Sequence, residues 1–226
     1  MTFKRIFVPC HFSSGSNLTK ALIGIGMCFA GDGKKNPNIE DTLVAASISA
    51  INNSDFRILS VLTNWIGVHF TRINVDRLFR VLKTISEDKV LCYWSAVSYW
   101  LAQDRRFIRL QKLYDGKILD LLETGSDFQI SRYGEDKRFV GSKLRVPSNL
   151  LTIKKSDILQ PSQLSKLHDA YKYRIIQGPT YRADMWALLD HFPEISIAEL
   201  ARQTYGSFAT AWKVKHDWNI LNNAAA

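Results

Sequence analysis

The stretch SIAELARQTYGSFATAWKVKHDW, residues 196–218, decides the fold expected for the C-terminal end of this 226-residue chain. Ser196 is followed three residues later by Glu199, which is the spacing of a capping box. In a capping box each side chain can bond a backbone N–H group that the first helical turn leaves free. The pattern therefore predicts a short helix over residues 197–204.

A turn and two further helices are expected around that short helix. Gly206 and Ser207 supply the turn, and a longer helix with apolar residues at helical spacing follows over residues 208–221. Upstream, residues 183–192 have the same spacing and stop at Pro193, which cannot continue a helix. The sequence thus predicts three helices in quick succession within residues 183–221.

This arrangement resembles the helix-turn-helix family of DNA-binding proteins, over about a sixth of the chain. The shared features are Glu-Leu-Ala at 199–201, the glycine of the turn, and a helix bearing alanine and threonine that ends in basic residues. One feature departs from the pattern, because Gly206 lies five positions after Ala201 where four is usual. The resemblance implies binding of double-stranded DNA, with the third helix in the major groove.

The third helix has two distinct faces when its residues are placed at about 100° each. One face is expected to be buried, with Ala211, Val214, Trp218 and Leu221, and the opposite one holds Ala209, Lys213 and His216. The candidate DNA contacts on and beside that opposite face are Ser207, Thr210, Lys213 and His216. The flanking Asp217 would repel phosphate. We also expect Gly206→Val to damage the turn, on the assumption that this glycine has a positive φ.

Two further segments mix or align basic side chains. YKYR at 171–174 and GPTYR at 178–182 add Lys172, Arg174 and Arg182 as candidate DNA contacts, and the alternative, which the sequence favours slightly, is a packing role for these segments. A separate basic helix face is formed by Arg105, Arg106, Arg109 and Lys112. Such a face is either a solvated surface or a further nucleic-acid contact.

Composition favours a packed, intracellular protein. The chain has 30 Lys and Arg against 21 Asp and Glu, a net charge of +9, which attracts phosphate backbones. Its three cysteines are widely spaced and include no CxxC pair, which argues against a disulfide framework and a zinc site. No stretch reaches the length of apolar sequence that a membrane span needs. A cytoplasmic location without membrane contact is expected.

The rest of the chain predicts a helical domain and a connector. Helices are expected over residues 18–30, 40–51, 55–70, 75–85 and 89–103, the last extending through 113. Residues 114–160 are rich in glycine and predict an irregular connector, in which 128–130 and 144–146 could be short strands. A C-terminal helical domain follows over 161–226, with Pro161 in a first helical turn.

Signatures of enzymes are weak. The five histidines have no metal-binding spacing, and no nucleophile has a base nearby, so neither a catalytic nor a metal site is expected, and no cofactor. One alternative is a Mg²⁺-dependent nuclease that would use Asp120 or Asp127 with Glu135 and Lys137. In such nucleases two carboxylates hold the metal and the lysine assists the attacking group.

The sequence as a whole predicts a mainly α protein with a helical N-terminal domain (1–113), an irregular connector (114–160) and a C-terminal domain (161–226) that contains the helix-turn-helix (183–221). The expected function is a double-stranded DNA-binding regulator, similar in architecture to bacterial repressors and antitoxins, with a protein partner or a homodimer through its N-terminal domain. A protein-interaction subunit of a defence or toxin-antitoxin assembly is a second alternative beside the nuclease.

Overall fold

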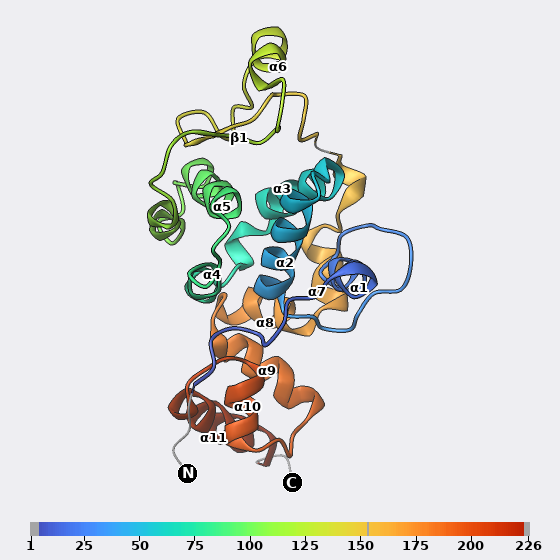
Figure 1. Cartoon of the computed structure of the whole chain (residues 1–226). Helices are drawn as coiled ribbons and strands as arrows, with labels where there is room; N and C mark the ends of the chain where they lie inside the picture. Colours follow the sequence, from blue (N-terminus) through green and yellow to red (C-terminus); the bar gives the residue numbers. More distant parts are fainter. Residues whose placement is uncertain (1–4, 153, 224–226) are drawn as a thin grey trace.

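The computed structural model describes residues 5–152 and 154–223 and is mainly helical, as predicted (Figure 1). The body of the molecule contains α1 (Gly15–Gly24), α2 (Ile39–Asn52), α3 (Phe56–His69), α4 (Val75–Leu82), α5 (Asp88–Trp100), α6 (Ser126–Tyr133), α7 (Pro161–Leu167) and α8 (Asp169–Gln177). The C-terminal end contains α9 (Tyr181–His191), α10 (Ile197–Gln203) and α11 (Phe208–Asn223). No helix within the described ranges is long and apolar enough to cross a membrane.

The central helices begin where the sequence places capping residues. The side-chain oxygens of Asp55 and Asn74 accept hydrogen bonds from the backbone N–H groups of Ile58 (3.0 Å) and Arg77 (3.2 Å). These bonds satisfy N–H groups that the first turns of α3 and α4 leave without a helical partner. The predicted starts of both helices are therefore confirmed.

The first predicted helix ends earlier than expected. α1 stops at Gly24, and Gly26 has a φ of +90°, which a continuing right-handed helix cannot contain. The following residues instead pair with a distant segment, because Cys28 N donates to Asp157 O at 2.8 Å and Leu159 N donates to Gly26 O at 2.7 Å. Contacts between residues far apart in the sequence thus replace the last helical turns that periodicity predicted.

The connector is not a loose linker. Its buried residues Leu121, Phe139, Leu144 and Val146 join the main hydrophobic core of the body. A parallel pair of short strands, β1 (Leu119–Asp120) and β2 (Leu144–Arg145), confirms the strand predicted at 144–146. The strand predicted at 128–130 is wrong, since these residues lie in α6 and Phe128 is exposed. Among the described residues, the body also contains the 3₁₀ helices η1 (Phe70–Arg72), η2 (Phe107–Leu113) and η3 (Lys155–Asp157).

The described residues form two hydrophobic cores. The main core includes residues from Leu18 to Tyr171, so α7 and α8 belong to it and not to the C-terminal unit. The second core lies within α9, α10 and α11, which we call the trihelical unit. The boundary between the two cores therefore lies between Tyr171 and Met185, later than the domain boundary at residue 161 that the sequence indicated.

Two histidines are buried in the main body and are hydrogen-bonded in the neutral state. Nε2 of His168 donates to Pro37 O (2.9 Å) while its Nδ1 accepts from Tyr171 N (3.2 Å), and a protonated Nδ1 would face that N–H. His69 contacts Leu159 O and the Tyr171 hydroxyl with its two ring nitrogens. Burial lowers the pKa of both His69 and His168 to about 4.

These histidines predict a loss of stability in mild acid. The unfolded chain takes up their protons near pH 6.5 and the folded chain only near pH 4, so the free energy of unfolding falls as the pH drops through that window. The expected slope is about 1.4 kcal/mol per pH unit for each histidine. Urea unfolding of the parent and of His168→Gln at a series of pH values measures it. The variant should have a shallower slope, and parallel curves would contradict the assignment to His168.

Candidate nucleic-acid interface

The trihelical unit lies at one end of the molecule and has its own core (Figure 1). Its fully buried residues come from all three helices: Met185, Leu189, Leu200, Ala201, Ala211 and Val214. The observed helix bounds lie within two residues of those predicted for 183–192, 197–204 and 208–221. The three-helix arrangement that the capping and turn signals predicted is therefore present.

The short helix α10 begins at the predicted cap. The Ser196 hydroxyl accepts a hydrogen bond from Glu199 N at 3.2 Å, as the first half of a capping box requires. The Glu199 carboxylate does not complete the box, because it accepts from Arg202 Nε (2.7 Å) and Gln203 Nε2 (2.5 Å) instead. One side-chain cap is thus enough to fix this helix start.

The turn between α10 and α11 differs from the prediction in its backbone. The residue with a positive φ is Tyr205, at +58°, and Gly206 is not in that conformation. Gly206 is required for another reason, since a Cβ built on it would lie 2.1 Å from Cε of the buried Met185. In this turn, which is one residue longer between Ala201 and Gly206 than the usual pattern, Tyr205 has the left-handed conformation. Gly206 allows close packing of the turn against α9.

The two faces of α11 lie as predicted, apart from one residue. Ala211 and Val214 are fully buried and Trp218 packs against the second core, but Leu221 is 66% exposed because it lies beyond the end of that core. The outward face presents Ala209, Lys213 and His216, all exposed. This face also carries two exposed apolar side chains, Trp212 and Ile220, and the Trp212 ring stacks on His216.

The hydroxyl groups of Ser207 and Thr210, predicted as DNA contacts at the start of α11, form hydrogen bonds within its first turn. Ser207 Oγ accepts from Thr210 N at 3.1 Å, and the two hydroxyl oxygens lie 2.7 Å apart. Ser207 is therefore the cap of this helix. Both side chains are only partly buried, so lone pairs and rotation remain for an outside contact.

The three candidate DNA contacts upstream of α10 differ in their exposure to solvent. Lys172 is exposed on α8. Arg182 is partly exposed and pairs with Asp217 of α11 at 3.1 Å. Arg174 is 1% exposed and donates to both oxygens of Asp184 and of Glu40, at 2.6–2.9 Å. Its side chain cannot reach DNA in this structure, so that expected contact is wrong.

Arg174 is the centre of a buried ionic cluster that joins the trihelical unit to the body. Burial disfavours its charge, but the carboxylates of Asp184 and Glu40 outweigh that effect and raise the pKa of Arg174 above its ordinary range. Glu40 also lies 3.9 Å from Arg77, which is fully buried in α4. The cluster therefore holds α2, α4, α8 and α9 together through charged side chains that are buried.

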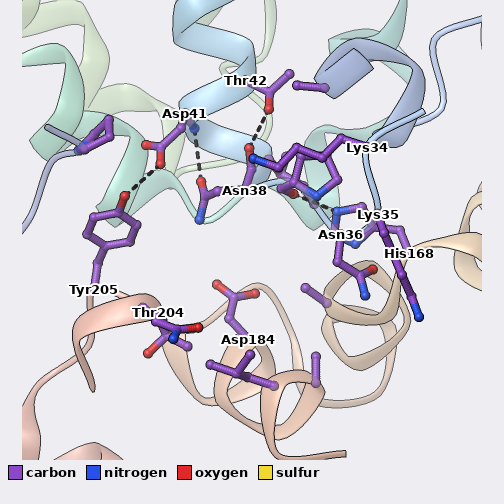
Figure 2. A pocket seen from close by; sticks show the side chains of 18 of the residues that line it. Lys34, Lys35, Asn36, Asn38, Asp41, Thr42, His168, Asp184, Thr204 and Tyr205 are labelled. Atoms are coloured by element: carbon purple, nitrogen blue, oxygen red, sulfur yellow. Dashed lines mark hydrogen bonds between the residues drawn. The ribbon is translucent and has the colours of Figure 1, made fainter. Parts of the chain in front are cut away.

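A cavity of about 670 Å³, lined by both polar and apolar residues, lies beside this cluster at the junction of body and trihelical unit. Figure 2 shows Asp184 reaching into it from the trihelical unit, opposite Asn38 and Asp41 at the start of α2, with Tyr205 on one flank and His168 on the other. The Tyr205 hydroxyl donates to Asp41 Oδ2 at 3.1 Å. The turn that precedes α11 is thus anchored directly to α2.

The same turn is held from its other side. Arg5 Nε donates to Tyr205 O at 3.0 Å, and the Arg77 guanidinium lies 3.5 Å from the centre of the Tyr205 ring. The Arg77 side chain also donates to Phe7 O at 2.9 Å. Because body, N-terminal segment and turn share these contacts, the start of α11 has a defined position relative to α4.

Positive charge is concentrated on the body near α4 and η2, not on the trihelical unit. Residues 70–113 contain nine basic and four acidic residues, a net charge of +5, whereas residues 181–226 contain four basic and five acidic, a net charge of −1. The exposed basic residues of this surface, which we call the α4–η2 surface, are Arg80, Lys83, Arg105, Arg109 and Lys112. The η2 part of this surface was predicted from the sequence, whereas Arg80 and Lys83 were not, although their spacing on one helix face would have indicated them.

The carboxylates of the alternative nuclease site, Asp120 and Asp127, both pair with Arg145. Asp120 lies 3.3 Å from Arg145 Nε, and Asp127 is hydrogen-bonded to the same guanidinium. The hydrogen bond that Arg145 donates to Asp127 and the charges of Asp120 and Glu135 raise the pKa of Arg145. Within residues 5–152 and 154–223, no group of three His, Cys, Asp or Glu side chains could hold a metal ion. The nuclease alternative is not supported by this geometry.

Three local features define the geometry of the trihelical unit. These are the Ser196 cap, the tight turn at Tyr205 and Gly206, and a third helix with one buried and one exposed face. No protein-family model, curated protein or solved structure matches the chain.

Proposed function

We propose that this protein is a regulator that binds double-stranded DNA through the exposed face of α11. The observation that carries the proposal is the trihelical unit, whose independent core leaves Ala209, Lys213 and His216 on the outward face of its third helix. A third helix presented in this way can enter a major groove while the second helix braces it. Lys213 would contact a phosphate or a guanine, and Thr210 a phosphate or a thymine methyl group.

The α4–η2 surface supports the proposal electrostatically. The trihelical unit itself has a net charge of −1 and would gain little from the phosphate backbone. A chain of contacts links the two regions: Asp76 of α4 accepts from the Tyr181 hydroxyl at 3.2 Å, and the next residue, Arg182, pairs with Asp217 of α11. Cations on α4 can therefore attract the backbone of a duplex that α11 contacts.

The double variant Lys213→Ala, Thr210→Ala tests the role of α11. We expect its affinity for duplex DNA to fall about tenfold or more, since a lost base or phosphate contact costs roughly 1–3 kcal/mol. Fluorescence anisotropy with a labelled random-sequence duplex, over a series of salt concentrations, measures both affinity and salt dependence. Lys20→Ala, which removes an exposed lysine from α1, is the matched control. Equal affinities for parent and double variant would exclude α11 as the contacting helix.

A second candidate function is a protein-interaction subunit, favoured by the apolar residues on the same face. Trp212 and Ile220 are 54% and 55% exposed on α11, where a DNA-reading face would carry mainly polar groups. A second copy of the chain is the simplest partner, because symmetric dimers are the commonest assemblies. Sedimentation of the parent and of Trp212→Ala compares their association. A parent that remains monomeric at high concentration would argue against self-association through this face.

A further inference from the structure

A small hollow lies where the starts of α4 and α9 meet η2. It has a volume of about 310 Å³ and is lined by Asn74, Val75, Asp76, Arg106, Arg109, Pro179, Thr180 and Tyr181. Thr180 is the residue before α9, and its side chain makes no hydrogen bond to the first helical turn. The backbone N–H groups at the start of this eleven-residue helix are therefore uncapped by a side chain, which is a favourable environment for an anion.

Asn74 supplies a second, independent feature of this hollow. Its side-chain oxygen accepts from Arg77 N at 3.2 Å, which fixes the orientation of the amide. The residue is only 3% exposed, and its amide nitrogen is buried without a hydrogen-bond partner. A buried donor left unpaired is costly in a folded protein, so a ligand oxygen that accepted from it would be bound favourably.

The charged side chains of the hollow are mainly cationic. Arg109 is 46% exposed and Arg106 is 38% exposed, and both line the hollow. Arg80 and Lys83 continue the positive surface along α4. Two carboxylates balance part of this charge, because Asp104 pairs with Arg106 while Asp76 accepts from Arg80, Arg109 and Tyr181.

We propose that this hollow binds a phosphate group of a nucleic-acid backbone, an inference that rests on the proposed contact of α11 with DNA. Arg109, the Asn74 amide and the uncapped start of α9 all donate hydrogen bonds, as phosphate oxygens require. A phosphate held here would lie beside α9, which pairs with α11 through Arg182 and Asp217. The site would thus position the duplex backbone next to the helix that contacts the bases.

Two substitutions with opposite expected effects test the site. Arg109→Ala should weaken duplex binding about tenfold and reduce the slope of log affinity against log salt by about 1, since it removes one phosphate contact. Asp76→Asn should strengthen binding severalfold, because it removes a negative charge that competes for Arg80 and Arg109. Arg132→Ala, an exposed arginine on the distant helix α6, is the control and should change neither quantity (Figure 1).

A measurement without DNA separates this inference from the proposed function. Inorganic phosphate should raise the melting temperature of the parent more than chloride at equal ionic strength, and the increase should be smaller in Arg109→Ala. That result together with no duplex binding would support a free phosphate group as the ligand and overturn the nucleic-acid assignment. Duplex binding that is unaffected by Arg109→Ala, with no phosphate effect on melting, would overturn the site and leave the role of α11 standing.

Discussion

Replacing Arg174 by alanine should lower the free energy of unfolding by about 3–5 kcal/mol, because it leaves buried carboxylates without a partner. Arg174 is 1% exposed and donates to both Glu40, which is fully buried, and Asp184, which is 8% exposed. After the change Glu40 has no access to solvent in the folded state, and Asp184 is exposed only at the cavity. Urea unfolding at neutral pH measures the effect.

The matched control is Arg182→Ala, which removes an arginine from a comparable ion pair at the surface. Both members of that pair are more than one third exposed, so its loss should cost less than about 1 kcal/mol. Similar losses for the two variants would contradict the description of Arg174 as the centre of a buried cluster. They would also restore Arg174 as a candidate surface contact.

Gly206→Val should lower the free energy of unfolding by about 1–3 kcal/mol through overpacking. The reason is steric, because even a Cβ at this position would lie 2.1 Å from Cε of Met185, which is fully buried in the second core. The backbone of Gly206 itself is not in the left-handed region. The substitution should therefore disturb the packing between the turn and α9.

A double-mutant cycle with Met185→Ala distinguishes a steric clash from backbone strain as the cause of the lost stability. If the clash causes the loss, Gly206→Val should cost less in the Met185→Ala background than in the parent, with a coupling of about 0.5–3 kcal/mol. Equal costs in both backgrounds would instead favour a backbone origin. Circular dichroism of each variant establishes whether the three helices persist.

The distribution of charge determines which region of the protein is expected to attract the DNA backbone. In the folded chain the positive charge is concentrated near α4 and η2, while the trihelical unit is nearly balanced. Affinity and specificity are then expected to come from different regions. Variants of the α4–η2 surface should change the salt dependence of binding, and variants of α11 should change the preference among sequences.

Local signals determined much of this structure. The starts of α3, α4 and α10 follow from Asp55, Asn74 and Ser196, each of which bonds a backbone N–H group three residues along the chain. The faces of α11 follow from helical periodicity. These features depend on neighbours within one or two turns, so the order of residues is sufficient to predict them.

Tertiary structure decided the features that depend on distant partners. Arg174 looks like a surface cation in its own segment, and it is buried because Glu40, 134 positions earlier, lies beside it in the fold. The left-handed residue of the turn is Tyr205, whose ring and hydroxyl contact Arg77 and Asp41. The hollow beside α9 likewise exists only where separate segments meet. Burial, charge pairing and cavities arise from such long-range contacts, which periodicity and local motifs do not specify.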